Sequence, residues 1–256
     1  FAVSGQVLPP ELTCINGDTI IWSNVNNDCG PFISYDIFFS AEPEGPFNLL
    51  ASVTNETQEF YDHNTSGGAS WYYYIVSNYD CPGEPVISSD TLSNGSLATV
   101  TIQSVDVQGD NVQLSWYPGE SPQTSGYIIF RREDLGFVAI DTIFGATSYL
   151  DVDVDIDLQS EEYIVNAIDD CFNSSIFGTP QQTMLVETAV DSCAQSVLLN
   201  WNPYVNWTNG VGQYQLFYGV GNNPEDFLLF DSTESTSIIF DQAIADTTYC
   251  FFIRAI

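Results

Sequence analysis

The chain has 256 residues, with 34 aspartates and glutamates but only three arginines and no lysine, so its formal net charge is −31. This balance excludes nucleic acid and anionic lipid as expected partners, because binding to either needs clustered Lys and Arg. Hydrophobic residues make up 44% of the chain and aromatic residues 14%, which is enough for folded cores and unlike an acidic disordered tail. No apolar run reaches the ~18–20 residues of a membrane span, so no membrane insertion is expected.

Short apolar runs with a period of two residues predict β-strands along the chain. Residues 112–116, 127–130 and 163–168 are such runs, and they are rich in β-branched and aromatic side chains. Turn-forming pairs such as Asn16-Gly17 and Pro118-Gly119 separate the runs. No stretch has the i, i+3, i+4, i+7 apolar spacing of a stable helix, so the pattern predicts an all-β sandwich or barrel.

Three copies of one unit recur along the chain. In each copy a strand-like run ends in tryptophan, the next run opens with tyrosine, a phenylalanine begins a third run, and a later run opens with tyrosine again. In chain order these positions are Trp22, Tyr35, Phe47 and Tyr73, then Trp116, Tyr127, Phe137 and Tyr163, then Trp201, Tyr214, Phe227 and Tyr249. The phenylalanines lie 90 residues apart in both intervals, which favours three separate units over one large fold.

This pattern of tryptophan and tyrosine resembles fibronectin type III domains over nearly the whole chain. The resemblance implies an all-β fold of three tandem antiparallel β-sandwiches of the fibronectin type III or immunoglobulin-like kind, with the tryptophan between the two sheets. The expected domains are residues 9–93, 97–186 and 187–256, after an N-terminal extension or strand at residues 1–8. The expected core residues are Trp22, Trp116, Trp201, Tyr35, Tyr127, Tyr214, Tyr73, Tyr163 and Tyr249.

The third unit is expected to lack its last strand, because residue 256 falls inside its penultimate strand. One explanation is that the sequence is a fragment of a longer chain. The other is that a strand from a second subunit fills the open groove and builds a filament by strand addition. The segment 1–7 (FAVSGQV) is the candidate donor.

A narrower resemblance links the chain to repeats of large secreted Bacteroidetes surface proteins. It is carried by residues 167–171 (AIDDC), by the spacing of Cys193, Trp201, Trp207 and Val211, and by residues 248–255 (TYCFFIRA). Such proteins often end in a sorting domain for type IX secretion or gliding motility. The resemblance therefore implies an extracellular or cell-surface location.

Six cysteines, an even number, suggest disulfides and an oxidising compartment. No C-x-x-C occurs and there is a single histidine, so the composition argues against a zinc site held by thiolates. Fibronectin-type topology implies the pairs Cys29–Cys81 and Cys193–Cys250, each at one pole of a sandwich. It also places Cys14 and Cys171 where the first two domains would meet, which suggests a bridge between domains.

The densest carboxylate cluster is Asp151, Asp153, Asp155 and Asp157. On a strand all four would share one face, about 7 Å apart for neighbours, and could hold Ca²⁺. The alternative is a solvated strand face or linker. Calcium is the only cofactor suggested.

The sequence favours a non-enzymatic protein. Acidic pairs are too common here for their spacing to indicate a glycosidase, no G-x-S-x-G occurs, and His63 lies in a turn-like segment. We expect a structural or adhesive rod, as a stalk or fibre segment of a secreted bacterial protein, with protein or surface glycans as partners. The alternative is an accessory module of a secreted enzyme that binds carbohydrate, for instance by stacking of Trp207 on a sugar.

Overall fold

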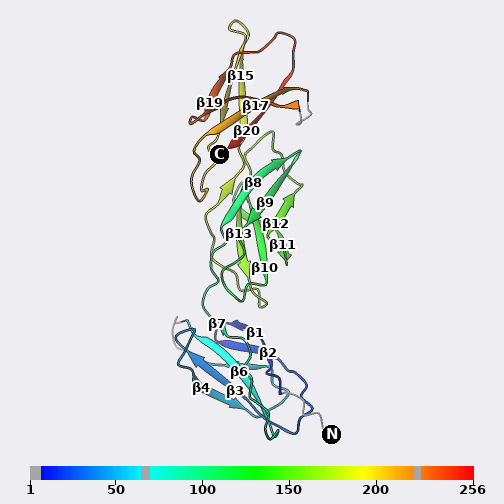
Figure 1. Cartoon of the computed structure of the whole chain (residues 1–256), viewed down its shortest axis with the longest axis vertical. Helices are drawn as coiled ribbons and strands as arrows, with labels where there is room; N and C mark the ends of the chain where they lie inside the picture. The colour runs from blue at the N-terminus through cyan, green and yellow to red at the C-terminus, as the bar shows by residue number, and fades with distance from the viewer. Residues whose placement is uncertain (1–6, 65–69, 222–225) are drawn as a thin grey trace. The chain divides into compact units, whose positions relative to one another are not determined.

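The computed structural model describes residues 7–64, 70–221 and 226–256. Within these residues the chain forms twenty β-strands, which pair in antiparallel fashion in all three repeats. The strands make six sheets, which fall into three pairs in chain order (Figure 1). No helix in the described part of the chain is long and apolar enough to cross a membrane.

The first repeat pairs a three-stranded sheet, β1-β2-β5, with a four-stranded sheet, β4-β3-β6-β7. Gly17 makes the tight turn between β1 and β2 possible, because its φ of +61° is a conformation that other residues rarely adopt. The strands are β1 (Glu11–Asn16), β2 (Thr19–Ser23), β3 (Phe32–Ser40), β4 (Asn48–Val53), β5 (Phe60–Asp62), β6 (Tyr72–Tyr79) and β7 (Leu92–Ser93).

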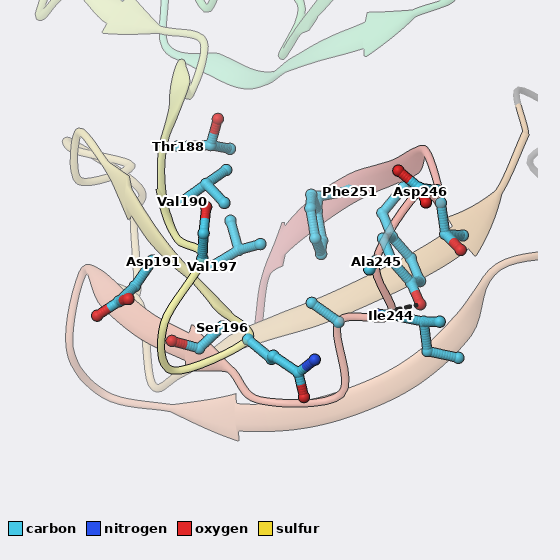
Figure 2. A pocket seen from close by; sticks show the side chains of 14 residues that line it. Thr188, Val190, Asp191, Ser196, Val197, Ile244, Ala245, Asp246 and Phe251 are labelled. Atoms are coloured by element: carbon cyan, nitrogen blue, oxygen red, sulfur yellow. Dashed lines mark hydrogen bonds between the residues drawn. The ribbon is translucent and has the colours of Figure 1, made fainter.

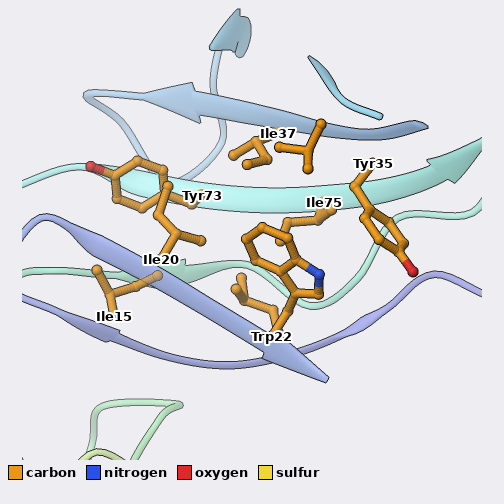
Figure 3. Packing of buried hydrophobic residues seen from close by; sticks show 9 residues of the cluster. Ile15, Ile20, Trp22, Tyr35, Ile37, Tyr73 and Ile75 are labelled. Carbon is orange, nitrogen blue, oxygen red and sulfur yellow. The ribbon is translucent and has the colours of Figure 1, made fainter. Parts of the chain in front are cut away.

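Both sheets of the first repeat contribute alternate residues to one core (Figure 3). Trp22 on β2 meets Tyr35 on β3 edge to face, with ring centroids 5.8 Å apart, and only 1% of Trp22 is exposed. Burying a ring of roughly 150–250 Å² contributes on the order of 4–6 kcal/mol at about 25 cal/mol per Å². The repeated tryptophan therefore acts as a core anchor, as the sequence predicts.

The second repeat has the same arrangement, with sheets β12-β9-β8 and β11-β10-β13-β14. Gly109, at φ +61°, takes the place of Gly17 in its first hairpin. Trp116, Tyr127 and Tyr163 are buried. The strands are β8 (Ile102–Gln108), β9 (Asn111–Trp116), β10 (Gly126–Glu133), β11 (Gly136–Phe144), β12 (Ser148–Asp151), β13 (Glu162–Ile168) and β14 (Gln181–Gln182).

The third repeat pairs two three-stranded sheets, β15-β16-β19 and β18-β17-β20. Among the described residues no strand stands beside β20 where β7 and β14 stand in the other repeats, as expected for a sandwich without its last strand. Trp201 meets Tyr214 at 5.5 Å, edge to face, as Trp22 meets Tyr35. The strands are β15 (Val186–Asp191), β16 (Ser196–Trp201), β17 (Tyr214–Val220), β18 (Leu228–Thr233), β19 (Ser237–Phe240) and β20 (Tyr249–Ala255).

Eight of the nine expected core residues are buried, and Tyr249 is only partly buried. Strand register explains the difference. Phe39 lies opposite Tyr73 in the first repeat, and the matching residue Tyr218 lies opposite Phe251. Phe251 therefore holds the position of Tyr73, two residues beyond the tyrosine that the sequence pattern selected.

Contacts divide the chain into two compact units. The first contains residues 1–99, 119–127 and 167–176, and the second contains residues 100–118, 128–166 and 177–256. Segments of the second repeat thus belong to both units. The domain boundaries predicted from the sequence stay a prediction.

Candidate functional site

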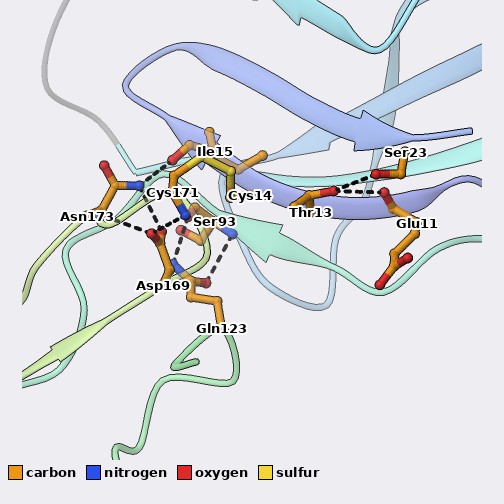
Figure 4. The surroundings of a disulfide bond; sticks show 10 residues. All are labelled: Glu11, Thr13, Cys14, Ile15, Ser23, Ser93, Gln123, Asp169, Cys171 and Asn173. Atoms are coloured by element: carbon orange, nitrogen blue, oxygen red, sulfur yellow. Dashed lines mark hydrogen bonds between the residues drawn. A yellow bond between two sulfur atoms is a disulfide. The ribbon is translucent and has the colours of Figure 1, made fainter. Parts of the chain in front are cut away.

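A disulfide joins β1 of the first repeat to the turn after β13 of the second (Figure 4). It links Cys14 to Cys171 with Cα atoms 5.8 Å apart, a normal separation for a bridge. Both cysteines belong to the first compact unit. The predicted bridge is confirmed.

The turn that carries Cys171 is held by the carboxylate of Asp169. Its Oδ1 accepts hydrogen bonds from the backbone N–H groups of Cys171 and Asn173, both at 2.9 Å. Its Oδ2 accepts one from Asn173 Nδ2 at 2.8 Å. The same Asn173 amide nitrogen donates to the Ile15 carbonyl at 2.8 Å (Figure 4). The turn is therefore ordered by its own side chains and attached to β1 beside the disulfide.

A second loop of the second repeat also bonds to the first unit's chain. Gln123 Nε2 donates to the Ser93 carbonyl at 3.0 Å, and Ser93 N donates to Gln123 Oε1 at 3.4 Å. The backbone N–H of Ala98 donates to Ser121 Oγ at 2.8 Å. Polar contacts from two loops thus accompany the covalent link within the first compact unit.

The second predicted disulfide, Cys29–Cys81, is also present, with Cα atoms 5.6 Å apart. The third prediction is wrong, since no disulfide joins Cys193 to Cys250. Cys193 is exposed in the turn between β15 and β16. Cys250 alternates on β20 with Tyr249 and Phe251, which pack against the core, so its side chain leaves the opposite face of the sheet. Because side chains alternate along β20, the Cys250 thiol points away from the core and does not meet the Cys193 thiol.

A buried tyrosine connects the second and third repeats inside the second compact unit. The Tyr204 hydroxyl accepts a hydrogen bond from the backbone N–H of Val105 at 2.9 Å. Burial raises the pKa of Tyr204. Trp207 packs edge-on against the Tyr204 ring at 5.6 Å and against the third core. The proposed sugar platform Trp207 is therefore largely engaged in packing.

The acidic run of the second repeat does not lie along one strand. Strand β12 ends at Asp151, and the chain then turns, with Asp153 N donating to Asp151 Oδ1 at 3.1 Å. The expected single strand face is therefore wrong, and Asp153, Asp155 and Asp157 are exposed beyond the strand. Across the described ranges no group of three or more His, Cys, Asp or Glu side chains is placed to hold a metal ion. Calcium binding by Asp151, Asp153, Asp155 and Asp157 stays a prediction, which calorimetric titration with Ca²⁺ would test.

Asp151 instead takes part in a buried ionic cluster around Arg131. Its Oδ2 accepts hydrogen bonds from Arg131 Nη1 and from the Tyr163 hydroxyl, both at 2.9 Å. Glu161 lies 4.0 Å from Arg131, and the side chains of Asp151 and Glu161 are only 3% and 2% exposed. Glu133 also pairs with Arg131 at 2.9 Å.

The cluster shifts two pKa values. Burial opposes the charge on Arg131, but the hydrogen bonds and attraction of Glu133 and Asp151 outweigh it and raise the pKa of Arg131. Burial, with the negative charge of Asp151 and their hydrogen bond, raises the pKa of Tyr163. One arginine thus compensates carboxylates from β10, β12 and the segment before β13, which is a structural role.

His63 lies just after β5, outside any strand, and its ring is packed among aromatic side chains. Nδ1 is 2.9 Å from the Tyr73 hydroxyl, and the rings of Phe39 and Trp71 are 4.9 and 6.0 Å away. Burial lowers the pKa of His63, against the attraction of Asp18. This environment identifies a packed histidine, and no nucleophile is placed beside it by the contacts above.

The third repeat has a pocket of about 480 Å³ between β15, β20 and the loop before β20 (Figure 2). Apolar side chains such as Val190, Val197, Ile244 and Phe251 line it together with Asp191 and Asp246. The pocket lies on the side of the sandwich where β20 has no further strand. The candidate donor segment 1–7 falls outside the described residues, apart from Val7.

A partly exposed aromatic cluster in the first repeat was not predicted from the sequence. Phe38 and Tyr74 stack on the outer face of the sheet, with centroids 4.9 Å apart and planes 15° from parallel. Phe47 lies 4.8 Å from Tyr74. The sequence does carry a signal for this cluster. Ile37 and Phe39 face the core, so a strand with one solvated face should have a polar residue between them, and Phe38 stands there instead.

No protein-family model matches the sequence, and no curated protein matches it. Among solved structures the chain is similar to the FN1–FN3 domains of chicken CNTN1, at 13% sequence identity. The alignment covers 96% of this chain and 92% of that chain, with a TM-score of 0.25. The fold assignment therefore rests on strand order and register: the seven strands in two sheets expected from the fibronectin type III resemblance are present in the first and second repeats.

Proposed function

We propose that this chain is a structural or adhesive segment of an extracellular protein, a stalk or fibre segment that holds successive sandwiches in a fixed order. The observation that carries the proposal is the Cys14–Cys171 disulfide between β1 of one repeat and a turn of the next. A bridge of this kind persists in an oxidising compartment. It restricts the junction between repeats, which is useful to a spacer.

The location and source are part of the same proposal. The disulfides and the sandwich fold are consistent with an extracellular protein. The resemblance of residues 167–171 and 248–255 to repeats of secreted Bacteroidetes surface proteins supports a bacterial cell-surface origin and export by type IX secretion. Catalysis is not part of the proposal, because the contacts described above give the single histidine and the buried carboxylates packing roles.

The test compares the full chain with a Cys14→Ser/Cys171→Ser variant by negative-stain electron microscopy. We expect a narrow distribution of angles between the first two sandwiches in the unsubstituted chain and a broad one in the variant. The matched control is Cys193→Ser, which removes an exposed thiol that forms no disulfide and leaves the distribution narrow.

Peptide mapping without reduction, on protein isolated from its producing cells, provides the decisive check. We expect a cross-linked peptide pair containing Cys14 and Cys171. Free alkylation of both thiols would contradict the proposal, because the junction would then not be covalently fixed in the protein's own compartment.

An accessory module that binds carbohydrate is the second candidate function. It is favoured by the partly exposed aromatic cluster of Phe38, Phe47 and Tyr74. Protein neighbours and surface glycans are the partners that these two functions propose.

A further inference from the structure

The outer face of the sheet β4-β3-β6-β7 carries large apolar side chains where a solvated face is expected to be polar. Tyr35 and Ile37 on β3, and Tyr73 and Ile75 on β6, point into the core. Because neighbours on a strand point to opposite faces, Phe38 and Tyr74 lie on the outer face, directly opposite each other in the strand register. Leu49, which pairs with Phe38, is 54% exposed on the same sheet.

These rings form one wall of a groove of about 580 Å³, within the usual range for small-ligand sites of about 300–1,000 Å³. Its lining residues are Phe38, Pro43, Glu44, Phe47, Tyr74, Val76, Val86, Ser88 and Thr91. The polar members are one carboxylate, Glu44, and two hydroxyls, Ser88 and Thr91. No cation lines the groove, since the three arginines of the chain lie at positions 131, 132 and 254.

The corresponding face of the second repeat is covered by the chain itself. Phe130, three residues after Tyr127 as Phe38 is three after Tyr35, contacts Phe177 at 4.9 Å. Phe177 also approaches Phe137, and the Arg132 guanidinium lies 4.6 Å above the Phe137 ring. These aromatic rings thus pack against partners from their own repeat.

The third repeat has the same strand register, and there an arginine lies beside the aromatic pair, although Phe252 is still 40% exposed. Phe217 lies opposite Phe252, as Phe38 lies opposite Tyr74. The guanidinium of Arg254 lies 5.1 Å from the Phe217 ring and 5.8 Å from the Phe252 ring. The first repeat has the same aromatic pair but no arginine, and there a groove stands beside the rings.

From this difference we propose that the groove of the first repeat binds a neutral oligosaccharide. Sugar rings present C–H faces that pack on aromatic rings, and their hydroxyls donate hydrogen bonds to the acceptors that Glu44, Ser88 and Thr91 provide. Sulfated, phosphorylated and uronic-acid ligands are disfavoured by the carboxylate in the groove and the net charge of −31. This site deepens the second candidate function, the carbohydrate-binding module, and rests on it, whereas the stalk function does not depend on it.

The experiment applies the full chain to an array of neutral gluco-, manno-, xylo- and galacto-oligosaccharides, with sulfated and uronic-acid glycans for comparison. Hits are measured by titration calorimetry, and a lysine-rich peptide is titrated in parallel. We expect a neutral glycan to bind with Kd at or below about 1 mM and the acidic glycans and the peptide not to bind.

Three variants locate the site. Phe38→Ser is expected to weaken binding at least about 10-fold, equivalent to about 1.4 kcal/mol. Phe217→Ser, at the matching position under Arg254, leaves affinity unchanged and controls for loss of a ring from the same strand position. Glu44→Ala, in an exposed loop, is expected to weaken binding about 3-fold or more without unfolding risk, so the test does not depend on the fold of Phe38→Ser.

Several results would overturn the proposal. One is the absence of any neutral glycan bound at that limit, and another is binding of the lysine-rich peptide in place of glycans. Equal losses in Phe38→Ser and Phe217→Ser, or no loss in Glu44→Ala, would place binding elsewhere on the chain. None of these outcomes affects the Cys14–Cys171 mapping, so the two proposals fail separately.

Discussion

Each arginine of this acidic chain has a defined neighbourhood. Arg131 compensates the buried carboxylates Asp151 and Glu161. Arg132 contacts Glu162 and the Phe137 ring, and Arg254 lies beside two aromatic rings of the third repeat. Of the three, only Arg131 neutralises carboxylates that are shielded from water, so only its removal would leave buried negative charge unpaired. The three positions should therefore differ strongly in their effect on stability.

Replacing Arg131 by methionine is expected to lower the free energy of unfolding by about 3–5 kcal/mol, since it strands buried negative charges. Arg132→Met is the matched control, because its ion pair is more exposed than that of Arg131, with side chains 54% and 23% exposed, and its loss should cost less than about 2 kcal/mol. Urea denaturation of both variants measures the difference. Equal losses would show that burial of the cluster is not what makes Arg131 important.

Stability should fall in alkali because buried tyrosines resist ionisation. Burial, with the nearby Asp18, raises the pKa of Tyr73 from 10.0 to about 12. The unfolded chain therefore loses this proton first, and the folded state loses stability as pH rises from 10 to 12, by roughly 2–3 kcal/mol for this group. Below pH 10 the tyrosine is protonated in both states, so its contribution to the free energy of unfolding is fully present.

The check is the slope of unfolding free energy against pH between 10 and 12 in Tyr73→Phe. We expect a shallower slope than in the unsubstituted chain, although Tyr35 and Tyr163, whose pKa values are also raised by burial, keep part of it. The variant also loses the contact with His63, so it should be somewhat less stable at every pH. An unchanged slope would mean that Tyr73 ionises alike in both states.

At the scale of elements, the alternation of side chains along strands decides which residues face the core and which of them could be predicted from the sequence. The tryptophan-ended strands and the tyrosine-led strands were predictable because a residue type recurring in three units marks the core side. The positions of Tyr249 and Cys250 were not, because Tyr249 and Phe251 are both core-facing aromatics on β20 and only the register with β17 shows which one matches Tyr73. The turn after Asp151 was missed because its carboxylates satisfy a strand pattern equally well.

The contact between β8 and the loop after β16 gives a further prediction. Tyr204→Phe removes the acceptor for the buried backbone N–H of Val105, and leaving such a group unpaired costs about 1–3 kcal/mol. Hydrogen exchange should then show faster exchange at Val105, with β1 and β2 unaffected as an internal control. Unaltered exchange at Val105 would mean that water replaces the hydroxyl.

For the whole molecule, charge repulsion is the dominant electrostatic term. Four ion pairs are found among the described residues, too few to offset a net charge of −31. Such an excess destabilises the compact state and opposes association. The glycan and calcium proposals both name partners that do not add negative charge.

The melting temperature is therefore expected to rise with salt. Raising NaCl from about 0.01 to 1 M shortens the screening length from about 30 to 3 Å, which weakens repulsion between distant carboxylates. Differential scanning calorimetry at matched ionic strengths of NaCl and choline chloride measures the effect and separates screening from sodium binding. A melting temperature that falls with both salts would show that attractive pairs outweigh repulsion.

The Cys14–Cys171 bridge also decides how the chain carries mechanical load. The two cysteines are 157 residues apart in sequence, and the Cys29–Cys81 bridge lies within that interval. When tension is applied to the chain outside the bridge, it passes through the sulfur–sulfur bond and bypasses the residues between. Roughly 550 Å of extended polypeptide, at about 3.5 Å per residue, is thereby sheltered from stretching. The enclosed residues, which include most of the first and second repeats, are therefore spared the load, and extension of this segment comes from residues outside the bridge, including the whole third repeat.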